Sequence, residues 1–97
     1  MTTLNSAIYF PHDVVFQQLN GEAIVLNLTT GQTCNLDEIG ARMWELLSTH
    51  AAIEPAFLAL LDEYDVQQDR LNADLIKLVD NLAAHGLLAF QPAHPAG

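Results

Sequence analysis

The spacing of apolar residues changes from every second position to a helical period within residues 14–44, and this change constrains the fold most. Asn20-Gly21 separates two apolar, β-rich runs, which is the strongest short-range signal for a hairpin. A second turn at residues 29–31 leads to a short third strand, Gln32–Leu36. The sequence therefore predicts a meander of three strands over residues 13–36.

The second strand, residues 23–28, is apolar on both faces, as expected for a central strand. The first and third strands then lie outside it. An outer strand exposes unpaired backbone N–H and C=O groups along one edge. Because the chain shows no catalytic machinery, the edge of the third strand is the best candidate for a working surface.

The first predicted helix follows the third strand without a linker. Asn35 and Glu38 have the spacing of a capping box at its start. Gly40 lies inside this helix, where glycine costs about 1 kcal/mol relative to alanine, so we expect close packing against another backbone. Trp44 is predicted to anchor the core.

Two further helices are expected. One begins near Glu54-Pro55, and the last runs from about Asp69 to His85, with Gly86 as a left-handed cap. The predicted fold class is α+β, a winged helix-turn-helix-like domain with a three-stranded antiparallel sheet followed by three helices. Residues 1–12 are expected to form an N-terminal arm, 13–90 the domain, and 91–97 a flexible tail.

Charge excludes several function classes. The chain has three basic and twelve acidic residues, which gives a net charge of −9. Binding to nucleic acid or anionic lipid is therefore disfavoured. No apolar run approaches the roughly 20 residues that span a bilayer, and the N-terminus lacks the pattern of a secretory signal. The single Cys34 cannot form an internal disulfide. These features predict a cytoplasmic protein without a membrane or nucleic-acid partner.

No enzyme signature is found. The four histidines lack the spacing of metal ligands, and neither a nucleophile elbow nor a phosphate or dinucleotide loop occurs. The acidic group Asp62, Glu63 and Asp65 is interpreted as a solvated face, because its spacing does not match a calcium loop. Cys34 is interpreted as a packing residue. We therefore predict no catalytic residue, no metal and no cofactor.

The last helix has an unusually broad apolar face, about 160° against the roughly 100° that one packing contact needs. One stripe is expected to pack on the first two helices, and a second could line a groove open to a ligand, unless the sheet covers both. The first stripe comprises Leu71, Leu75, Leu78 and Leu82, and the second Ile76, Val79 and Ala83.

Several segments together resemble the PqqD-like family, the recognition elements for ribosomally made, post-translationally modified peptides. The resemblance covers roughly residues 13–88, and no single motif decides it. The segments are Gly-Glu-Ala-Ile-Val-Leu-Asn-Leu (21–28), Thr-Gly-Gln-Thr-Cys-Asn-Leu (30–36), Gly-Ala-Arg-Met-Trp-Glu-Leu-Leu (40–47), Asp-Glu-Tyr-Asp-Val (62–66), Asp-Leu (74–75) and Asn-Leu-Ala-Ala-His-Gly-Leu-Leu (81–88). Thr33-Cys34 stands where the family often has aromatic residues.

The resemblance implies a noncatalytic module that binds the leader of a precursor peptide and brings it to a modifying enzyme or leader peptidase. Free-standing members of this type resemble the leader-binding subunits of lasso peptide pathways. The leader would add as a strand to the third strand, with its side chains in a groove against the last helix. The implied peptide-binding residues are Gln32, Thr33, Cys34, Asn35, Leu36, Asn72, Ile76, Val79, Asp80 and Ala83. Val79→Asp should then weaken leader binding while the fold survives.

Three alternatives remain open from the sequence. The N-terminal arm, through Ile8-Tyr9-Phe10, could itself cover the strand edge. The same edge could serve a generic protein–protein adaptor or a homodimerisation module, so the protein could be a monomer or a homodimer. A DNA-binding regulator fits the fold but not the acidic last helix.

Overall fold

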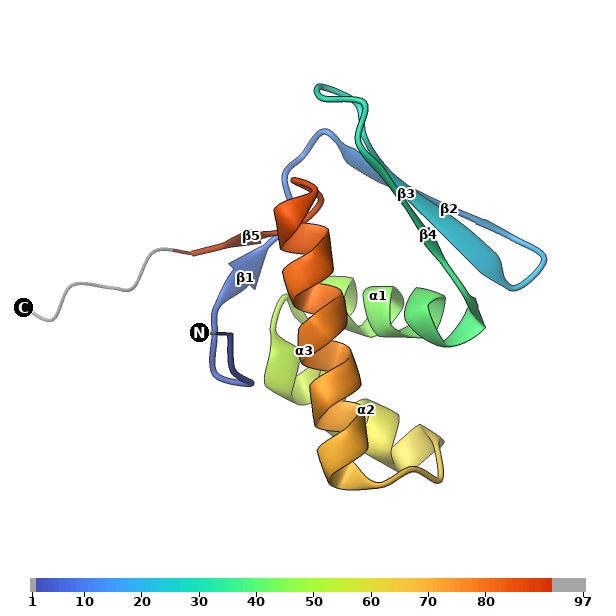
Figure 1. Cartoon of the computed structure of the whole chain (residues 1–97), viewed down its shortest axis with the longest axis vertical. Coiled ribbons are helices and arrows are strands. Elements are labelled where there is room, and N and C mark those ends of the chain that lie inside the picture. The colour runs from blue at the N-terminus through green and yellow to red at the C-terminus, as the bar shows by residue number, and fades with distance from the viewer. Residues whose placement is uncertain (1, 92–97) are drawn as a thin grey trace, which may run out of the picture.

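Three strands and then three helices follow one another along the chain, as the sequence predicts (Figure 1). The computed structural model describes residues 2–91. Two short strands at the ends of this region were not predicted. The elements are β1 (Ile8–Tyr9), β2 (Val14–Leu19), β3 (Glu22–Asn27), β4 (Thr33–Leu36), α1 (Glu38–His50), α2 (Ile53–Glu63), α3 (Gln68–Ala84) and β5 (Ala89–Phe90).

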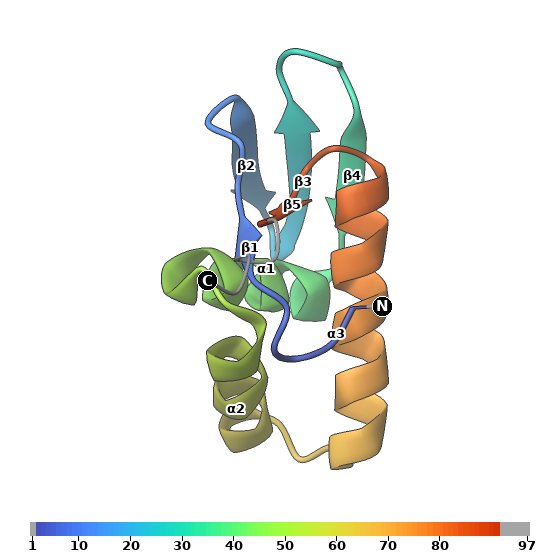
Figure 2. The same ribbon diagram turned by 90° about the vertical axis from the view of Figure 1, so that its left-hand side faces the viewer.

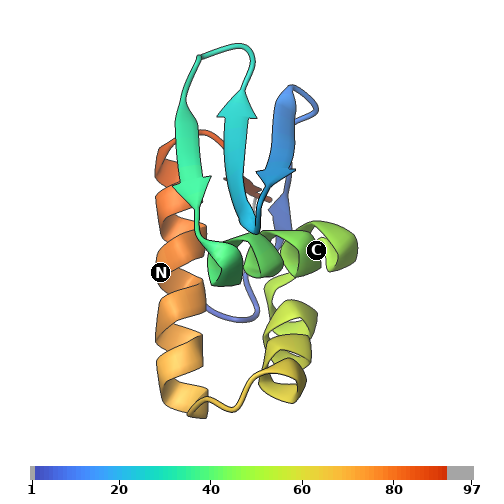
Figure 3. The ribbon, with the colours of Figure 1, turned by 90° about the vertical axis from the view of Figure 1, so that its right-hand side faces the viewer.

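The main sheet has the order β2-β3-β4, and both pairs are antiparallel. Asn20 and Gly21 both have positive φ, 55° and 83°, as a tight hairpin turn between β2 and β3 requires. The predicted hairpin and the central place of the second strand are therefore confirmed. Figures 2 and 3 show β4 as the strand on the α3 side of the sheet and β2 as the far strand.

One face of the sheet packs on the helices. Val25 in β3 is 0% exposed, and Trp44 in α1 is 5% exposed, so the prediction that Trp44 anchors the core is confirmed. The Phe16 ring from β2 stacks on Trp44 with centroids 5.8 Å apart. Phe10 meets the same indole edge-on at 4.8 Å. This aromatic group joins the sheet to α1.

The start of α1 differs from the prediction. Asn35 lies within β4, and the cap is Asp37, whose Oδ1 accepts the Gly40 N–H at 2.7 Å. The prediction that Gly40 packs closely against another backbone is also wrong. A Cβ added to Gly40 would lie 3.2 Å from Asp37 Oδ1 and 3.4 Å from the Leu36 Cβ. Glycine therefore makes room for the capping carboxylate and the buried Leu36 side chain.

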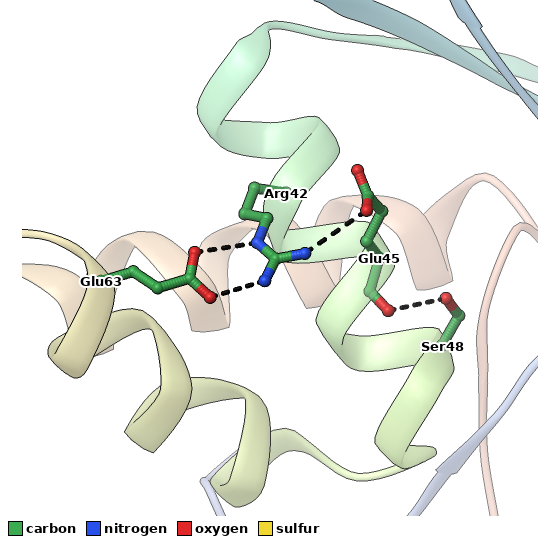
Figure 4. Close-up of polar contacts among 4 residues, drawn as sticks. All are labelled: Arg42, Glu45, Ser48 and Glu63. Carbon is green, nitrogen blue, oxygen red and sulfur yellow. Dashed lines mark hydrogen bonds and ion pairs between the residues drawn. The ribbon is translucent and has the colours of Figure 1, made fainter.

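An ion pair joins α1 to the end of α2 (Figure 4). The Arg42 guanidinium donates from Nε and Nη2 to the two oxygens of Glu63, at 2.8 and 2.6 Å. It also donates to Glu45 at 3.4 Å. These contacts lower the pKa of Glu63 and raise that of Arg42. Glu63 is thus a partner in a helix–helix contact rather than part of a freely solvated acidic face.

The C-terminus of α3 is closed by Gly86 at φ 70°, as predicted. The Leu87 N–H donates to the Leu82 carbonyl at 2.9 Å, and the Gly86 N–H donates to the Ala83 carbonyl at 3.1 Å. Both bonds are those of a Schellman motif. The chain then turns back, and Leu87 is buried in the core.

The N-terminal segment lies against the helices and β5. The Ala7 residue forms a bridge with Ala52 at the α1–α2 turn, and β1 pairs with β5. Ile8 is 1% exposed, so this part of the arm belongs to the core. The predicted tail, residues 91–97, lies outside the described residues except for Gln91.

Candidate functional site

The outer edge of β4 is open. Among residues 2–91, β4 pairs only with β3. The N-terminal segment, which could have covered this edge, instead pairs with Ala52 and β5. The same region of the chain leaves the outer edge of β2 unpaired as well. The sheet therefore has two edges to which a further strand could add.

The register shows which backbone groups point away from the sheet at β4. The Asn27 N–H donates to the Gln32 carbonyl at 2.9 Å, in line with the pairing of Val25 with Cys34. Hydrogen-bonded and non-hydrogen-bonded pairs alternate in antiparallel sheets. The N–H and C=O groups of Cys34 therefore face β3, whereas those of Thr33 and Asn35 face outward. Two donors and two acceptors are available on this edge.

Side chains of β4 alternate between the two faces of the sheet. Cys34 and Leu36 lie on the inner face, opposite Val25 and Ala23, and Leu36 is 5% exposed. Thr33 and Asn35 lie on the outer face and are exposed, as is Gln32 before the strand. The predicted residues on this side thus divide into an exposed group and a core residue, Leu36, with Cys34 partly buried between them.

Cys34 has the properties of a packing residue. Burial raises the pKa of its thiol above the ordinary value of 9.0, so the thiol is protonated at neutral pH. Its Sγ lies 3.9 Å from the Asn35 carbonyl oxygen. These properties do not favour a nucleophile.

The predicted residues of α3 fall in three environments. Asn72 and Asp80 are exposed, and Ile76 and Ala83 are half-buried. Val79 is 0% exposed, like Leu75 on the same face. The expectation that Val79 borders an open groove is therefore wrong, because its side chain is enclosed by the core.

The two sides of the buried stripe of α3 have different neighbours. Thr2 Oγ1 donates to the Asp80 carboxylate, which places the N-terminal segment on the side of Asp80 and Ile76. Leu78, also half-buried, lies roughly 160° from Ile76 around the helix at about 100° per residue. Figure 1 shows the N-terminal segment on one side of α3 and β4 on the other. The flank of α3 toward β4 is thus the one that carries Leu78.

A cavity of about 700 Å³ lies at the hairpin end of the sheet, beside the open edge. Its lining includes Leu19 and Ile24, which are 76% and 37% exposed, together with Asn35 and Leu36 of β4. None of the residues that line it comes from α3. The cavity therefore belongs to the sheet and to the start of α1.

Residues 2–91 show neither a metal-binding cluster nor a membrane-spanning helix. No three or more His, Cys, Asp or Glu residues in this range are placed to hold a metal ion. No helix in it has the length and apolar character needed to cross a membrane.

Residues 22–88 match the family model of the coenzyme PQQ synthesis protein D, PqqD. The chain belongs to the PqqD family. This match begins at β3 and ends just after α3, so it contains the open edge of β4 and both flanks of α3. A comparison with curated protein sequences finds no significant match.

Two solved structures share the PqqD-like fold of this chain. One is TbiB1 in complex with the TbiA(beta) leader peptide, at 28% identity and a TM-score of 0.75, covering 88% of this chain and 96% of that one. The other is a lasso peptide synthetase B1 complexed with the leader peptide, at 18% identity and a TM-score of 0.73, covering 86% and 98%. The PqqD-like fold expected from the sequence is confirmed.

Three features of the site were missed by sequence reasoning. The helical spacing places Leu78 in one stripe with Leu71, Leu75 and Leu82, and only the position of the sheet distinguishes it from them. The cavity joins the hairpin to the start of α1, which no local pattern predicts. The sequence predicts β2 as an outer strand, but no local pattern indicates that its edge is a second open surface.

Proposed function

We propose that this protein binds the leader segment of a ribosomally made precursor peptide by adding it as a strand to the open edge of β4. The observation that carries the proposal is the free edge of β4, where the outward backbone groups of Thr33 and Asn35 have no partner strand within residues 2–91. Two solved proteins of the same fold are complexes with leader peptides, which supports the choice of ligand. Strand addition is a common mode of peptide recognition.

Backbone pairing alone is too weak for a stable complex. Four hydrogen bonds contribute about 2–6 kcal/mol net. Association costs roughly 4–15 kcal/mol because the two molecules lose translational and rotational freedom. Apolar side chains of the leader must therefore supply the remaining affinity. They need a surface next to β4, and α3 is the helix on that side of the sheet (Figure 3).

The flank of α3 that carries Leu78 provides this surface. It also bears Asp74 and Asn81, four residues before and three residues after Leu78, which share its face of the helix. The flank inferred from the sequence, with Asn72, Ile76, Asp80 and Ala83, already contacts the N-terminal segment through Thr2 and Asp80. The leader can use the Leu78 flank without displacing that segment.

In this proposal the protein performs no chemistry itself. It holds the leader in an extended conformation and delivers it to a modifying enzyme or leader peptidase. The protonated Cys34 thiol, facing the core side of the sheet, takes no part in a reaction. The protein would raise the effective concentration of the precursor at its enzyme.

The strand-addition step can be tested by isothermal titration. The titrants are the leader segment of a short precursor encoded beside this chain and the TbiA(beta) leader peptide. Thr33→Pro removes one outward N–H from β4 at the first strand position, where proline is tolerated. Gln18→Pro removes the matched outward N–H from the other edge, on β2. We expect the first variant to lose leader binding and the second to keep it.

Equal affinity of both proline variants would contradict strand addition at β4. Binding of neither leader by the wild type, together with binding of an unrelated folded protein at β4, would favour the generic adaptor or homodimerisation module. Circular dichroism of each variant must first show an intact domain, because the titration compares folded proteins only.

The flank of α3 can be assigned with a second matched pair. Leu78→Ser and Ile76→Ser remove similar half-buried aliphatic side chains from opposite sides of the buried stripe. If the leader uses the flank toward β4, Leu78→Ser weakens binding while Ile76→Ser does not. The reverse result would restore the flank inferred from the sequence.

A further inference from the structure

We propose that the cavity at the hairpin end of the sheet is a subsite for a basic side chain of the bound peptide. This inference rests on the proposed function and names a specificity element of the same site. The cavity, about 700 Å³ in volume, shares Asn35 and Leu36 with β4, so it continues the open edge toward α1. A peptide on that edge therefore passes directly beside the cavity.

The register brings a peptide side chain to the cavity. Two cross-strand rows line the cavity. Gln17, Ile24 and Asn35 form the row on the outer face of the sheet, and Gln18, Ala23 and Leu36 form the neighbouring row on the inner face. Asp37 follows β4 with an extended backbone, φ −75° and ψ −176°, so it continues the alternation of Thr33 and Asn35. In an antiparallel addition, the peptide residue opposite Asn35 and the one two positions before it, opposite Asp37, both project onto the outer face.

The cavity wall has an apolar part and an acidic part. Leu19 and Ile24 expose aliphatic surface, and Glu22 and Asp37 contribute two carboxylates to the lining. Asp37 Oδ1 caps the Gly40 N–H, whereas its second oxygen has no hydrogen bond or ion pair within residues 2–91. A lysine or arginine side chain combines a matching aliphatic stem with a charged end.

The surrounding charge favours a cation over a neutral side chain. No lysine or arginine occurs between Val14 and Asp37, so the whole main sheet carries only Glu22 as a charged residue. Arg42, the nearest basic residue in the sequence, is engaged by Glu63 and Glu45. The acidic chain thus presents an unneutralised negative region beside the peptide path.

The experiment is a selection of displayed random 15-residue peptides on the purified full chain. A parallel selection uses the double variant Glu22→Gln, Asp37→Asn. Both replacements keep the side-chain shape, and asparagine remains a good helix cap, so the fold should persist. A control variant, Asp69→Asn, removes an acid far from the cavity in the first turn of α3.

We expect peptides selected on the wild type and on Asp69→Asn to share a lysine or arginine at one fixed position relative to their apolar residues. Peptides selected on the double variant should lack it. Replacing that basic residue by norleucine should weaken binding about two- to fivefold on the wild type and have no effect on the double variant.

Selected peptides that share apolar positions but no basic residue, or the same basic residue on the double variant, would overturn the subsite and leave strand addition intact. Failure of the wild type to bind either leader peptide in the titration would overturn the proposed function itself, and the subsite with it. Selected peptides that lose affinity for Thr33→Pro pair with β4, so the absence of a basic residue among them counts against the subsite alone.

Discussion

The Asn27 side chain donates from Nδ2 to the Gly86 carbonyl oxygen at 2.9 Å, so the end of β3 is fixed to the cap of α3. Its Oδ1 accepts the N–H groups of Thr29 and Thr30 at 2.9 and 3.0 Å, which shapes the turn before β4. Asn27 is 6% exposed, and both the nitrogen and the oxygen of its side-chain amide are hydrogen-bonded. One buried residue thus joins the end of β3 and the turn before β4 to the end of α3.

Asn27→Ala should lower the free energy of unfolding by about 1–3 kcal/mol, because the Gly86 carbonyl and two turn N–H groups lose their buried partner. Urea denaturation followed by circular dichroism measures this change. Asn81→Ala, at an exposed position of α3, is the matched control and should alter stability by less than about 0.5 kcal/mol. Equal effects of the two variants would contradict a structural role for the Asn27 amide.

Val79→Asp should unfold the domain instead of altering peptide affinity alone. Val79 is 0% exposed, and an unpaired carboxylate in that position costs about 3–5 kcal/mol. Thermal denaturation and one-dimensional NMR would show the loss of a folded state. Ala73→Asp places the same charge on an exposed position of α3 and should leave the spectrum unchanged. A folded Val79→Asp protein would show that this part of the core opens.

The contribution of Glu63 to stability should depend on pH. The Arg42 hydrogen bonds lower the pKa of Glu63 from its ordinary value of 4.5 in the folded state. The stabilisation is therefore present above pH 4.5 and is lost as pH falls through the folded-state pKa. The melting temperature of the wild type should exceed that of Glu63→Gln at pH 7, and the two should converge in acid. A difference that persists unchanged at low pH would exclude the ion pair as its cause.

Gly86→Ala should destabilise the protein by about 1 kcal/mol, because an alanine at φ 70° is strained. Space is not the cause, since an added Cβ would lie 3.7 Å from Asn27 Nδ2, an ordinary contact. Chemical denaturation gives the change in unfolding free energy. Gly86→Asn should be milder, because asparagine tolerates the left-handed region, and an equal loss for both would argue against backbone strain.

Local signals predicted most of the fold. The Asn20-Gly21 hairpin and the Gly86 cap depend on short-range backbone preferences, which the sequence carries in full. The Asp37 cap was missed because Asn35 offered the same chemistry two residues earlier, and the choice between them depends on how far β4 extends. Pairing of β1 with β5 joins residues about 80 positions apart over two residues each, which leaves no periodic pattern to detect.

The site was less predictable than the fold. The sequence predicts the strand order, and with it a free edge on β4. Which backbone groups face outward, those of Thr33 and Asn35, depends on the register, which the sequence alone does not give. The environments of Val79 and Leu78 cannot be predicted from the sequence either, because each residue fits the helical spacing of apolar positions. Which of them is enclosed depends on the direction from which the sheet and the N-terminal segment approach α3, and that direction is set by contacts distant in the sequence.

Trp44 is the single tryptophan of the chain, and its indole contacts the rings of Phe10 and Phe16 with 5% of the residue surface exposed. Its fluorescence should therefore be blue-shifted in the native protein and move to the red when the sheet separates from α1. Both aromatic partners of Trp44 lie in β2 or before it and not in β4, so the emission wavelength reports native packing on that side of the sheet. Peptide binding at the β4 edge can then be measured in the same sample by a signal that does not depend on Trp44.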